Sequence, residues 1–354
     1  MNPAALARAE IRALKPYASA RALADSAGVL LNANENPWPP AGDGGLALNR
    51  YPDPQPAALK ARLAEVYGVD ESRLLITRGS DEGIDLLVRV FCRAGQDRVL
   101  VCPPCFGMYA LSARVQNADV IEAPLIEVGG QWQLDTAAVA QTLPCRLYFL
   151  CSPNNPTGNR IAADTVLELA RRVSDHGLVV IDEAYIEFSD SDSLADKVGL
   201  QPNLVVLRTL SKAYALAGCR IGAVIADPDV VDLLRRIIAP YPLPTPSVSA
   251  ALAALTPEAL ARQQDQLARL ERLKAALLEQ LELHADIKQV WPGEANFVLV
   301  RVEDAQALVQ DAFAAGIRLR DQSTQPDLDN CVRITVGSEE EMQTLAEFLR
   351  DWQP

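Results

Sequence analysis

Short apolar runs rich in β-branched residues alternate with amphipathic helical patterns through the middle of the chain. The runs predict strands at Leu74–Thr77, Arg98–Cys102, Asp119–Ala123, Arg146–Leu150, Leu178–Ile181, Leu204–Arg208 and Gly222–Ala226. Several are apolar throughout, which is typical of strands that are covered on both faces. Helical patterns such as Asp81–Cys92 and Ala163–His176 lie between them. The alternation predicts an α/β fold with a large, doubly wound, mostly parallel sheet.

The pattern changes after the proline-rich segment 241–246, where a long helix is predicted from Val248 to about Leu283. The remaining pattern predicts strands at Asn296–Val302 and Cys331–Val336 and helices at Ala305–Ala315 and Glu339–Trp352. We therefore expect an N-terminal arm (1–45) that packs with the small domain, a large domain (46–245) and a smaller α+β domain (246–354).

Composition narrows the class of function. With 49% hydrophobic and 22% charged residues, the 354-residue chain has an ordinary globular balance. The net charge of -13 argues against binding to nucleic acid or to an anionic membrane surface, since both need clustered Lys and Arg. The first residues lack the apolar core of a secretory signal, and no run approaches the roughly 18 apolar residues of a membrane span. We expect a cytoplasmic protein.

The seven cysteines are scattered and predict no disulfide framework. Cys102 and Cys105 flank two prolines, which suggests either a metal site or a redox dithiol. A zinc site needs about four ligands, and the only histidines, His176 and His284, are not near a second cysteine pair. Reduced, partly buried thiols are therefore the favoured interpretation, and no metal is expected.

Four polar motifs follow predicted strands, at the edge where open α/β sheets bind ligands. In the first, Arg78-Gly-Ser-Asp-Glu82, the N–H groups of Ser80 and Asp81 suit a phosphate, although a plain helix N-cap is the commoner role of such a pair. In the second, Ser152-Pro-Asn-Asn-Pro-Thr-Gly158, Asn155 projects from a tight loop that alone is more typical of a turn.

The other two motifs place charged residues directly after buried strands. Asp182 needs a partner there because a desolvated carboxylate is costly, and either a protonated pyridine nitrogen or the next helix could provide one. Lys212 precedes a run of small residues, a setting that can lower the pKa of a lysine that forms a Schiff base. Ser211 and Arg220 could hold a phosphate beside it. The joint order of the four motifs is much harder to explain as four independent structural features.

Together, Asn155-Pro-Thr-Gly158, Asp182-x-x-Tyr185 and Ser211-Lys212 followed by Arg220 resemble the fold-type I enzymes that use pyridoxal 5′-phosphate (PLP), the aspartate aminotransferase superfamily. The resemblance runs from about residue 31 to residue 337. Within the superfamily it is closest to the histidinol-phosphate aminotransferases, on the stretches Leu31-Asn-Ala-Asn-Glu-Asn-Pro37, Asn49-Arg-Tyr-Pro-Asp-Pro-Gln-Pro56, Arg318-Leu-Arg-Asp-Gln-Ser323 and Cys331-Val-Arg-Ile-Thr-Val-Gly337. The last two are specific, whereas the first is shared with sister families.

The resemblance implies catalytic roles for Lys212, Asp182 and Tyr185. Lys212 would carry PLP as a Schiff base and later move a proton, while Asp182 would pair with the pyridine nitrogen. Asn155 and Tyr185 would bond the phenolic oxygen of the ring. Phe106 would stack on the ring at a position where tyrosine is usual among relatives.

The resemblance also implies how the phosphate and the substrate are held. The cofactor phosphate would lie among Ser80, Asp81, Ser211 and Arg220. Tyr51 would reach the cofactor phosphate of the neighbouring subunit, so the active form would be a homodimer with shared active sites.

Substrate binding would fall to Arg320 and Arg333, which could take either a phosphate or a carboxylate. Without the resemblance, two surface ion-pairing arginines would be the simpler explanation. Asn36 stands where some members of the family place a tyrosine that contacts the substrate.

The resemblance predicts transamination between L-histidinol phosphate and 2-oxoglutarate, giving imidazole-acetol phosphate and L-glutamate, in histidine biosynthesis. An aromatic aminotransferase or a threonine-phosphate decarboxylase of the same fold is an alternative. A regulator that keeps the fold without turnover is another, and the intact Lys212, Asp182 and Arg220 argue against it.

Overall fold

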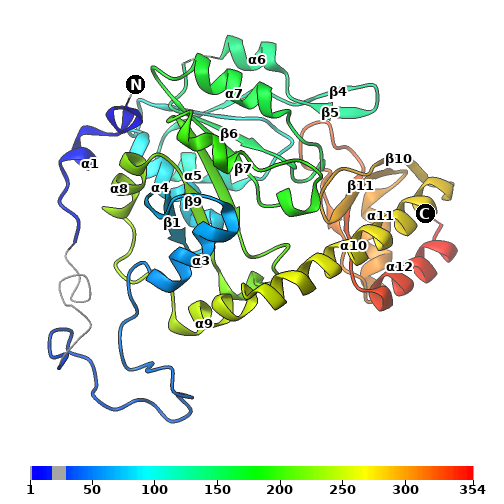
Figure 1. Cartoon of the computed structure of the whole chain (residues 1–354). Helices are drawn as coiled ribbons and strands as arrows, with labels where there is room; N and C mark the ends of the chain where they lie inside the picture. The colour runs from blue at the N-terminus through cyan, green and yellow to red at the C-terminus, as the bar shows by residue number, and fades with distance from the viewer. Residues whose placement is uncertain (1, 18–28, 143, 354) are drawn as a thin grey trace.

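The computed structural model describes residues 2–17, 29–142 and 144–353. Its centre is a seven-stranded sheet in the order β1-β9-β8-β7-β6-β2-β3 (Figure 1). The strands are β1 (Leu74–Thr77), β2 (Arg98–Val101), β3 (Asp119–Glu122), β6 (Leu147–Cys151), β7 (Leu178–Asp182), β8 (Leu204–Thr209) and β9 (Gly222–Ile225). β9 runs antiparallel to both of its neighbours, and the pairs from β8 to β3 are parallel. The prediction of a mostly parallel sheet is confirmed.

Helices cover both faces of this sheet, which explains the apolar runs. In β7, Val179 and Ile181 pack into one core, and Leu178 and Val180 pack into the other. On the first face lie α3 (Ala57–Tyr67) and α7 (Ala163–Arg172); on the second lie α4 (Gly79–Phe91), α5 (Met108–Val115) and α8 (Pro228–Arg235). Each strand therefore buries side chains in both directions, as a doubly wound sheet requires.

Shorter elements complete the large domain. They are η2 (Glu71–Arg73), η3 (Ile186–Phe188), η4 (Leu194–Gly199), η5 (Ala217–Cys219), α6 (Thr136–Gln141) and the hairpin of β4 (Ile126–Val128) and β5 (Gln131–Gln133). The sequence pattern did not predict this hairpin, because each of its strands is only three residues long and β4 is exposed throughout.

The smaller domain has a four-stranded antiparallel sheet in the order β10-β11-β13-β12. Its strands are β10 (Ile287–Trp291), β11 (Phe297–Val302), β12 (Arg320–Asp321) and β13 (Cys331–Thr335), and its helices are α11 (Ala305–Ala314) and α12 (Glu339–Asp351). Both helices share a core with the C-terminal half of α10 (Pro257–Leu283), the long helix that runs from the large domain to the small one (Figure 1).

The single helix predicted from Val248 to Leu283 was wrong. The segment forms two helices, α9 (Thr245–Ala254) and α10, separated at Leu255 and Thr256. Pro257 suits the first turn of a helix because it has no N–H to leave unpaired, and the Thr256 side chain accepts a hydrogen bond from the backbone N–H of Ala259.

The predicted packing of the N-terminal arm on the small domain was also wrong for its first residues. η1 (Pro3–Leu6) and α1 (Ala9–Ala13) lie on the large domain: the backbone N–H of Arg8 donates to the carbonyl of Val90 at 3.0 Å, and Arg236 donates to the carbonyl of Arg12 at 2.6 Å. Residues 29–50 lie in a long loop that extends away from the body of the molecule, and residues 51–55 return to the large domain, where the Gln55 side chain bonds the backbone of Ile76 (Figure 1). The boundaries at 45 and 245 remain our proposal.

The two domains meet at a contact between two glycines, Gly158 and Gly293. Both have positive φ angles, 73° and 55°. A Cβ atom on Gly158 would lie 2.7 Å from the Cα of Gly293, and one on Gly293 would lie 2.5 Å from the Cα of Gly158. The backbone N–H of Glu294 donates to the carbonyl of Gly158 at 2.7 Å. Only glycine allows the two backbones to come this close.

Among the described residues, the structure has no helix that is both long and apolar enough to cross a membrane.

Candidate active site

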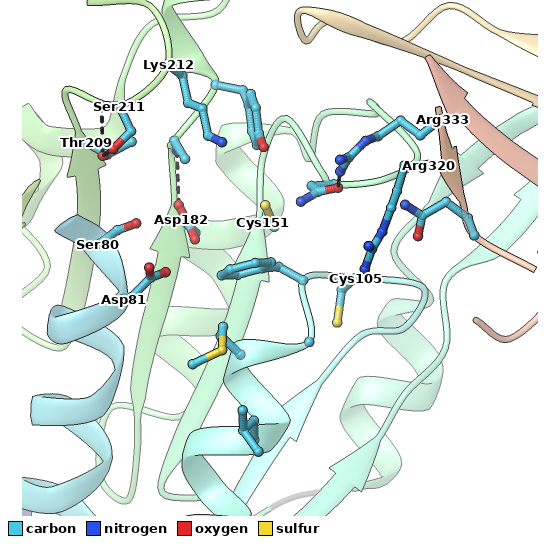
Figure 2. Close-up of a pocket in the computed structure, with 18 of the residues that line it drawn as sticks. Ser80, Asp81, Cys105, Cys151, Asp182, Thr209, Ser211, Lys212, Arg320 and Arg333 are labelled. Atoms are coloured by element: carbon cyan, nitrogen blue, oxygen red, sulfur yellow. Dashed lines mark hydrogen bonds between the residues drawn. The ribbon is translucent and has the colours of Figure 1, made fainter. Parts of the chain in front are cut away.

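A cavity of about 680 Å³ opens at the C-terminal ends of β6, β7 and β8, beside the start of α4. Strands β12 and β13 of the small domain close its other side (Figure 2). The predicted site residues that line it are Ser80, Asp81, Phe106, Asn155, Asp182, Tyr185, Ser211, Lys212, Arg220, Arg320 and Arg333. The fold therefore brings most of the predicted residues into one cavity.

Lys212 follows β8 and extends into this cavity above Asp182 (Figure 2). Its Nζ lies 5.6 Å from the centre of the Tyr185 ring. The side chain is more exposed than the sequence suggested, because the cavity is open above it. Its walls still remove enough water to lower the pKa of Lys212; the positive charge of Arg333 also lowers this pKa, while Asp81 and Asp182 oppose the shift.

Asp182 is the last residue of β7 and is almost fully buried. One carboxylate oxygen accepts the O–H of Tyr109 at 2.7 Å, and the other accepts the backbone N–H of Ala184 at 3.0 Å. Burial raises the pKa of Asp182 to about 6, and these two hydrogen bonds act in the opposite direction. A carboxylate has about four acceptor positions, so it can still accept a third donor.

Tyr109 is a site residue that the sequence analysis missed. It is fully buried, its ring stacks on Phe149 with centroids 5.0 Å apart, and it meets the edge of Phe106 at 5.7 Å. It belongs to no motif and lies 73 residues from Asp182. The one signal available was the need of a buried carboxylate for donors, which does not say where in the chain a donor lies.

The start of α4 and Arg220 form a cradle for an anion. The first N–H groups of a helix have no partner within it, and no side chain caps this helix. Arg220 lies 3.1 Å from a carboxylate oxygen of Asp81 and donates to Ser211 at 3.4 Å. Gly79, the first residue of α4, has a φ of 73°, which favours glycine, and a Cβ there would lie 2.7 Å from a nitrogen of Arg220. This arrangement suits a phosphate.

Two arginines mark the opposite end of the cavity. Arg320 on β12 and Arg333 on β13 are partners in the sheet register, and Figure 2 shows their side chains side by side. Arg333 donates to the side-chain oxygen of Asn155, and its guanidinium group lies 5.3 Å from the centre of the Phe297 ring. Its Nε is buried without a hydrogen-bond partner among the described residues. A buried donor without a partner beside a second cation is suited to an anionic ligand.

A contact between two aromatic rings joins the small domain to this site. Tyr185 of the large domain meets Phe297 of β11 edge to face, with centroids 5.3 Å apart. Gln322 and Gln325, which follow Arg320, also line the cavity. Gln322 falls within the stretch 318–323 that carries the resemblance, but neither glutamine was predicted as a site residue, because this residue type has no distinctive chemistry.

Tyr51 and Asn36 do not line the cavity in the described part of this chain. The Tyr51 ring stacks on Tyr241 with centroids 4.4 Å apart, and the Asn36 side chain accepts the backbone N–H of Trp38. Their predicted roles therefore stay predictions. All seven cysteines are free, in agreement with the prediction of reduced thiols.

The lining fits PLP at each of its functional groups. The cofactor carries an aldehyde, a pyridine nitrogen and a phosphate, and the cavity presents the Lys212 amine, the buried Asp182 carboxylate and the α4 cradle with Arg220. The unpaired Nε of Arg333 lies at the far end, where it remains available for a substrate.

Comparisons with known proteins identify the family of this chain. Residues 28–349 match the family described as aminotransferase class I and II. The chain is 46% identical to histidinol-phosphate aminotransferases of Xylella fastidiosa (98% of this chain, 96% of the relative) and Aeromonas hydrophila (99% and 98%). The crystal structure of histidinol-phosphate aminotransferase from Sinorhizobium meliloti in complex with pyridoxal-5′-phosphate superposes with a TM-score of 0.77 at 26% identity, covering 90% of each chain. This chain belongs to the aminotransferase class I and II family.

Proposed function

We propose that this protein is a PLP-dependent enzyme that transfers the amino group of L-histidinol phosphate to 2-oxoglutarate. The products are imidazole-acetol phosphate and L-glutamate, a reaction of histidine biosynthesis that we place in the cytoplasm. The observation that carries the choice of substrate is the pair Arg320 and Arg333 at the end of the cavity away from the phosphate cradle. The 46% identity to histidinol-phosphate aminotransferases over nearly the whole chain supports it.

Different residues of the chain would bind different groups of the cofactor. Lys212 would hold PLP through its amine, and Asp182 would keep the pyridine nitrogen protonated. Ser80, Asp81, Ser211 and Arg220 would bind the phosphate, and Phe106 would cover one face of the ring. Asn155 and Tyr185 would bond its phenolic oxygen. When bound, PLP supplies an electron sink for the electrons left at the substrate's α-carbon.

The proton transfers fall to Lys212. With its amine free, Lys212 would take the proton from the substrate's α-carbon and give it up on the other side of the transferred nitrogen. The cavity walls and Arg333 lower its pKa, so a larger fraction of the amine is unprotonated and able to act as a base. Neither histidine lines the cavity, so no histidine base is available there.

Arg320 and Arg333 would bind the anionic end of both substrates in turn. Two guanidinium groups can meet either the phosphate of histidinol phosphate or a carboxylate of glutamate, because both anions accept paired hydrogen bonds. A single site would thereby serve both half-reactions.

Single-turnover transfer from histidinol phosphate, compared with phenylalanine, tyrosine and threonine phosphate, tests the assignment. We expect the fastest loss of the visible cofactor band with histidinol phosphate, together with formation of a keto product. Faster reaction of an aromatic amino acid, or release of carbon dioxide from threonine phosphate, would show that a sister activity is the true one.

We also propose a homodimer in which Tyr51 reaches the partner's cofactor phosphate. The extended arm carries exposed apolar side chains, among them Val29, Leu31 and Trp38, which are 76–87% accessible in the single chain. Such side chains gathered on one segment are typical of a surface that another chain covers.

Mixing two inactive variants tests the sharing of sites. In a mixed dimer of Lys212→Ala and Tyr51→Ala chains, one site carries both defects and the other carries neither. We expect activity to reappear on mixing after brief dissociation. If each site used only its own chain's residues, the mixture would stay as inactive as its components.

A further inference from the structure

The Cys102-Pro-Pro-Cys105 segment, which no step above uses, is fastened to three other parts of the molecule. The carbonyl of Pro103 accepts the backbone N–H of Leu125 at 2.7 Å, and the carbonyl of Pro104 accepts the side-chain amide of Asn154 at 2.9 Å. Prolines have no N–H, so the first donor after them is the N–H of Cys105. It donates to the side-chain oxygen of Gln325 at 3.1 Å.

These bonds belong to a closed ring around the anion end of the cavity. The Gln325 amide donates to the side chain of Gln322 at 3.4 Å, and the backbone N–H of Gln322 donates to the carbonyl of Cys331 at 2.8 Å. Cys331 is on β13 with Arg333, and Arg333 donates to Asn155. Asn155 follows Asn154, which returns the ring to Pro104.

The ring passes between the two domains at two places. One is the bond from Arg333 to Asn155, and the other is the bond from Cys105 to Gln325. Arg320 lies on the strand that leads into the Gln325 segment, and its side chain reaches toward Cys105 (Figure 2). Since Arg320 is otherwise exposed, its position relative to Lys212 depends on how firmly the segment behind it is held.

We propose that Gln325 is a specificity-determining positioning residue for the anionic group of the substrate. Its bond to the Cys105 N–H fixes the segment between Arg320 and Arg333, and with it the distance of Arg320 from Lys212. This distance suits a substrate whose phosphate monoester is on the carbon next to the amine-bearing carbon. The identity of that substrate rests on the proposed function; the anion-positioning role of Gln325 does not.

The test compares Gln325→Met with wild type as PLP-loaded enzymes. Methionine has a similar length but cannot accept the Cys105 N–H. Histidinol phosphate and histidinol differ only in the phosphate, so the ratio of their single-turnover efficiencies measures discrimination for the anion. We expect the ratio to fall about tenfold in Gln325→Met, mainly through weaker binding, since a lost hydrogen bond contributes roughly this much. Gln343→Met, on the exposed face of α12, should leave it unchanged.

Two further measurements separate the possible failures. Binding of glycerol phosphate to the loaded enzyme, measured by calorimetry, should weaken about tenfold in Gln325→Met while the cofactor spectrum stays the same. Gln325→Asn keeps the amide but is one methylene too short, so it should show the same weakening as Gln325→Met. The role of Gln325 would be overturned if Gln325→Met lost the same single-turnover efficiency with histidinol as with histidinol phosphate. Unchanged binding of glycerol phosphate would overturn it too. A wild-type enzyme that ignores histidinol phosphate would overturn the proposed function alone.

Discussion

The two ends of the cavity are built in different ways. At the cofactor end, Asp182, Lys212 and Arg220 all belong to the large domain and follow strands or loops of one sheet. At the anion end, Arg320 and Arg333 come from the small domain and reach their places only through contacts between the domains. The first end is set by the packing of the sheet, whereas the second depends on how two separate domains meet.

The burial of the charged groups follows the same division. Asp182 is almost fully buried and both of its oxygens have donors from the large domain. Arg320 is exposed, and the Nε of Arg333 has no partner in the described structure. A site can therefore have a rigid, preorganised cofactor end and a more adjustable substrate end, and substitutions at the two ends should have different signatures.

The largest effect is expected at Lys212, the residue that we propose performs the chemistry at the cofactor end. Lys212→Ala should reduce turnover by about 10⁴-fold or more, because it removes both the covalent attachment and the base. The variant should still take up PLP non-covalently, without a band that borohydride reduction removes. Lys288→Ala, an exposed lysine paired with Glu303, is the matched control. Substantial activity in Lys212→Ala would remove this lysine from its role.

A smaller effect is expected at the anion end. Arg333→Ala should lower the efficiency of both half-reactions by about 100-fold, as expected when one partner of a charge-assisted bond is removed. The cofactor spectrum should change little. Arg318→Ala, an exposed arginine packed on Phe313, serves as control. If only the glutamate half-reaction suffers, the two substrates do not share this anion site.

The buried carboxylate of Asp182 should lower the stability of the protein when no cofactor is bound. Burial raises the pKa of Asp182 above the value of an unfolded chain, so the folded protein binds the proton more tightly. Stability is therefore lost as pH rises from about 4 to about 6, and the cost persists above that range. Apo Asp182→Asn should be more stable than apo wild type at pH 8, by up to a few kcal/mol. Thermal unfolding should show this difference shrinking below pH 6; a difference that grows on acidification would contradict the assignment.

The smallest effect is expected at Tyr109, which acts through Asp182. Tyr109→Phe keeps the ring against Phe149 but removes the O–H that lowers the pKa of Asp182. The acid limb of the pH–rate profile should move to higher pH and turnover should fall about tenfold, the worth of a hydrogen bond to a charged group. Tyr148→Phe, a buried tyrosine bonded to Cys145, should not move the limb. If the acid limb of the pH–rate profile does not move in Tyr109→Phe, the role of Tyr109 is limited to packing.

The same contrast explains what the sequence could predict. Parallel strands end at one edge of a sheet, so the motifs directly after buried strands, such as those of Asp182 and Lys212, could be assigned to one site from the sequence alone. Tyr109 and Gln325 could not be assigned to the site from the sequence, because their hydrogen-bond partners lie 73 and 220 residues away and neither residue type indicates such a contact.

Two errors had different origins. Thr256-Pro257 is a strong helix-start signal and could have predicted the break between α9 and α10, but it lies within a continuous apolar pattern that favours a single helix. The packing of residues 2–14 on the large domain rests on backbone and arginine contacts, such as that of Arg236, which no local pattern encodes.

The contact of Gly158 with Gly293 makes substrate preference open to change from outside the cavity. Any side chain at either position would act as a wedge between the domains, three residues along the chain from Asn155. The wedge would shift the small domain, and with it both arginines, while the strands that hold Asp182 and Lys212 stayed in place. Evolution or a protein engineer could thus alter which anion the enzyme accepts without changing one residue that touches it.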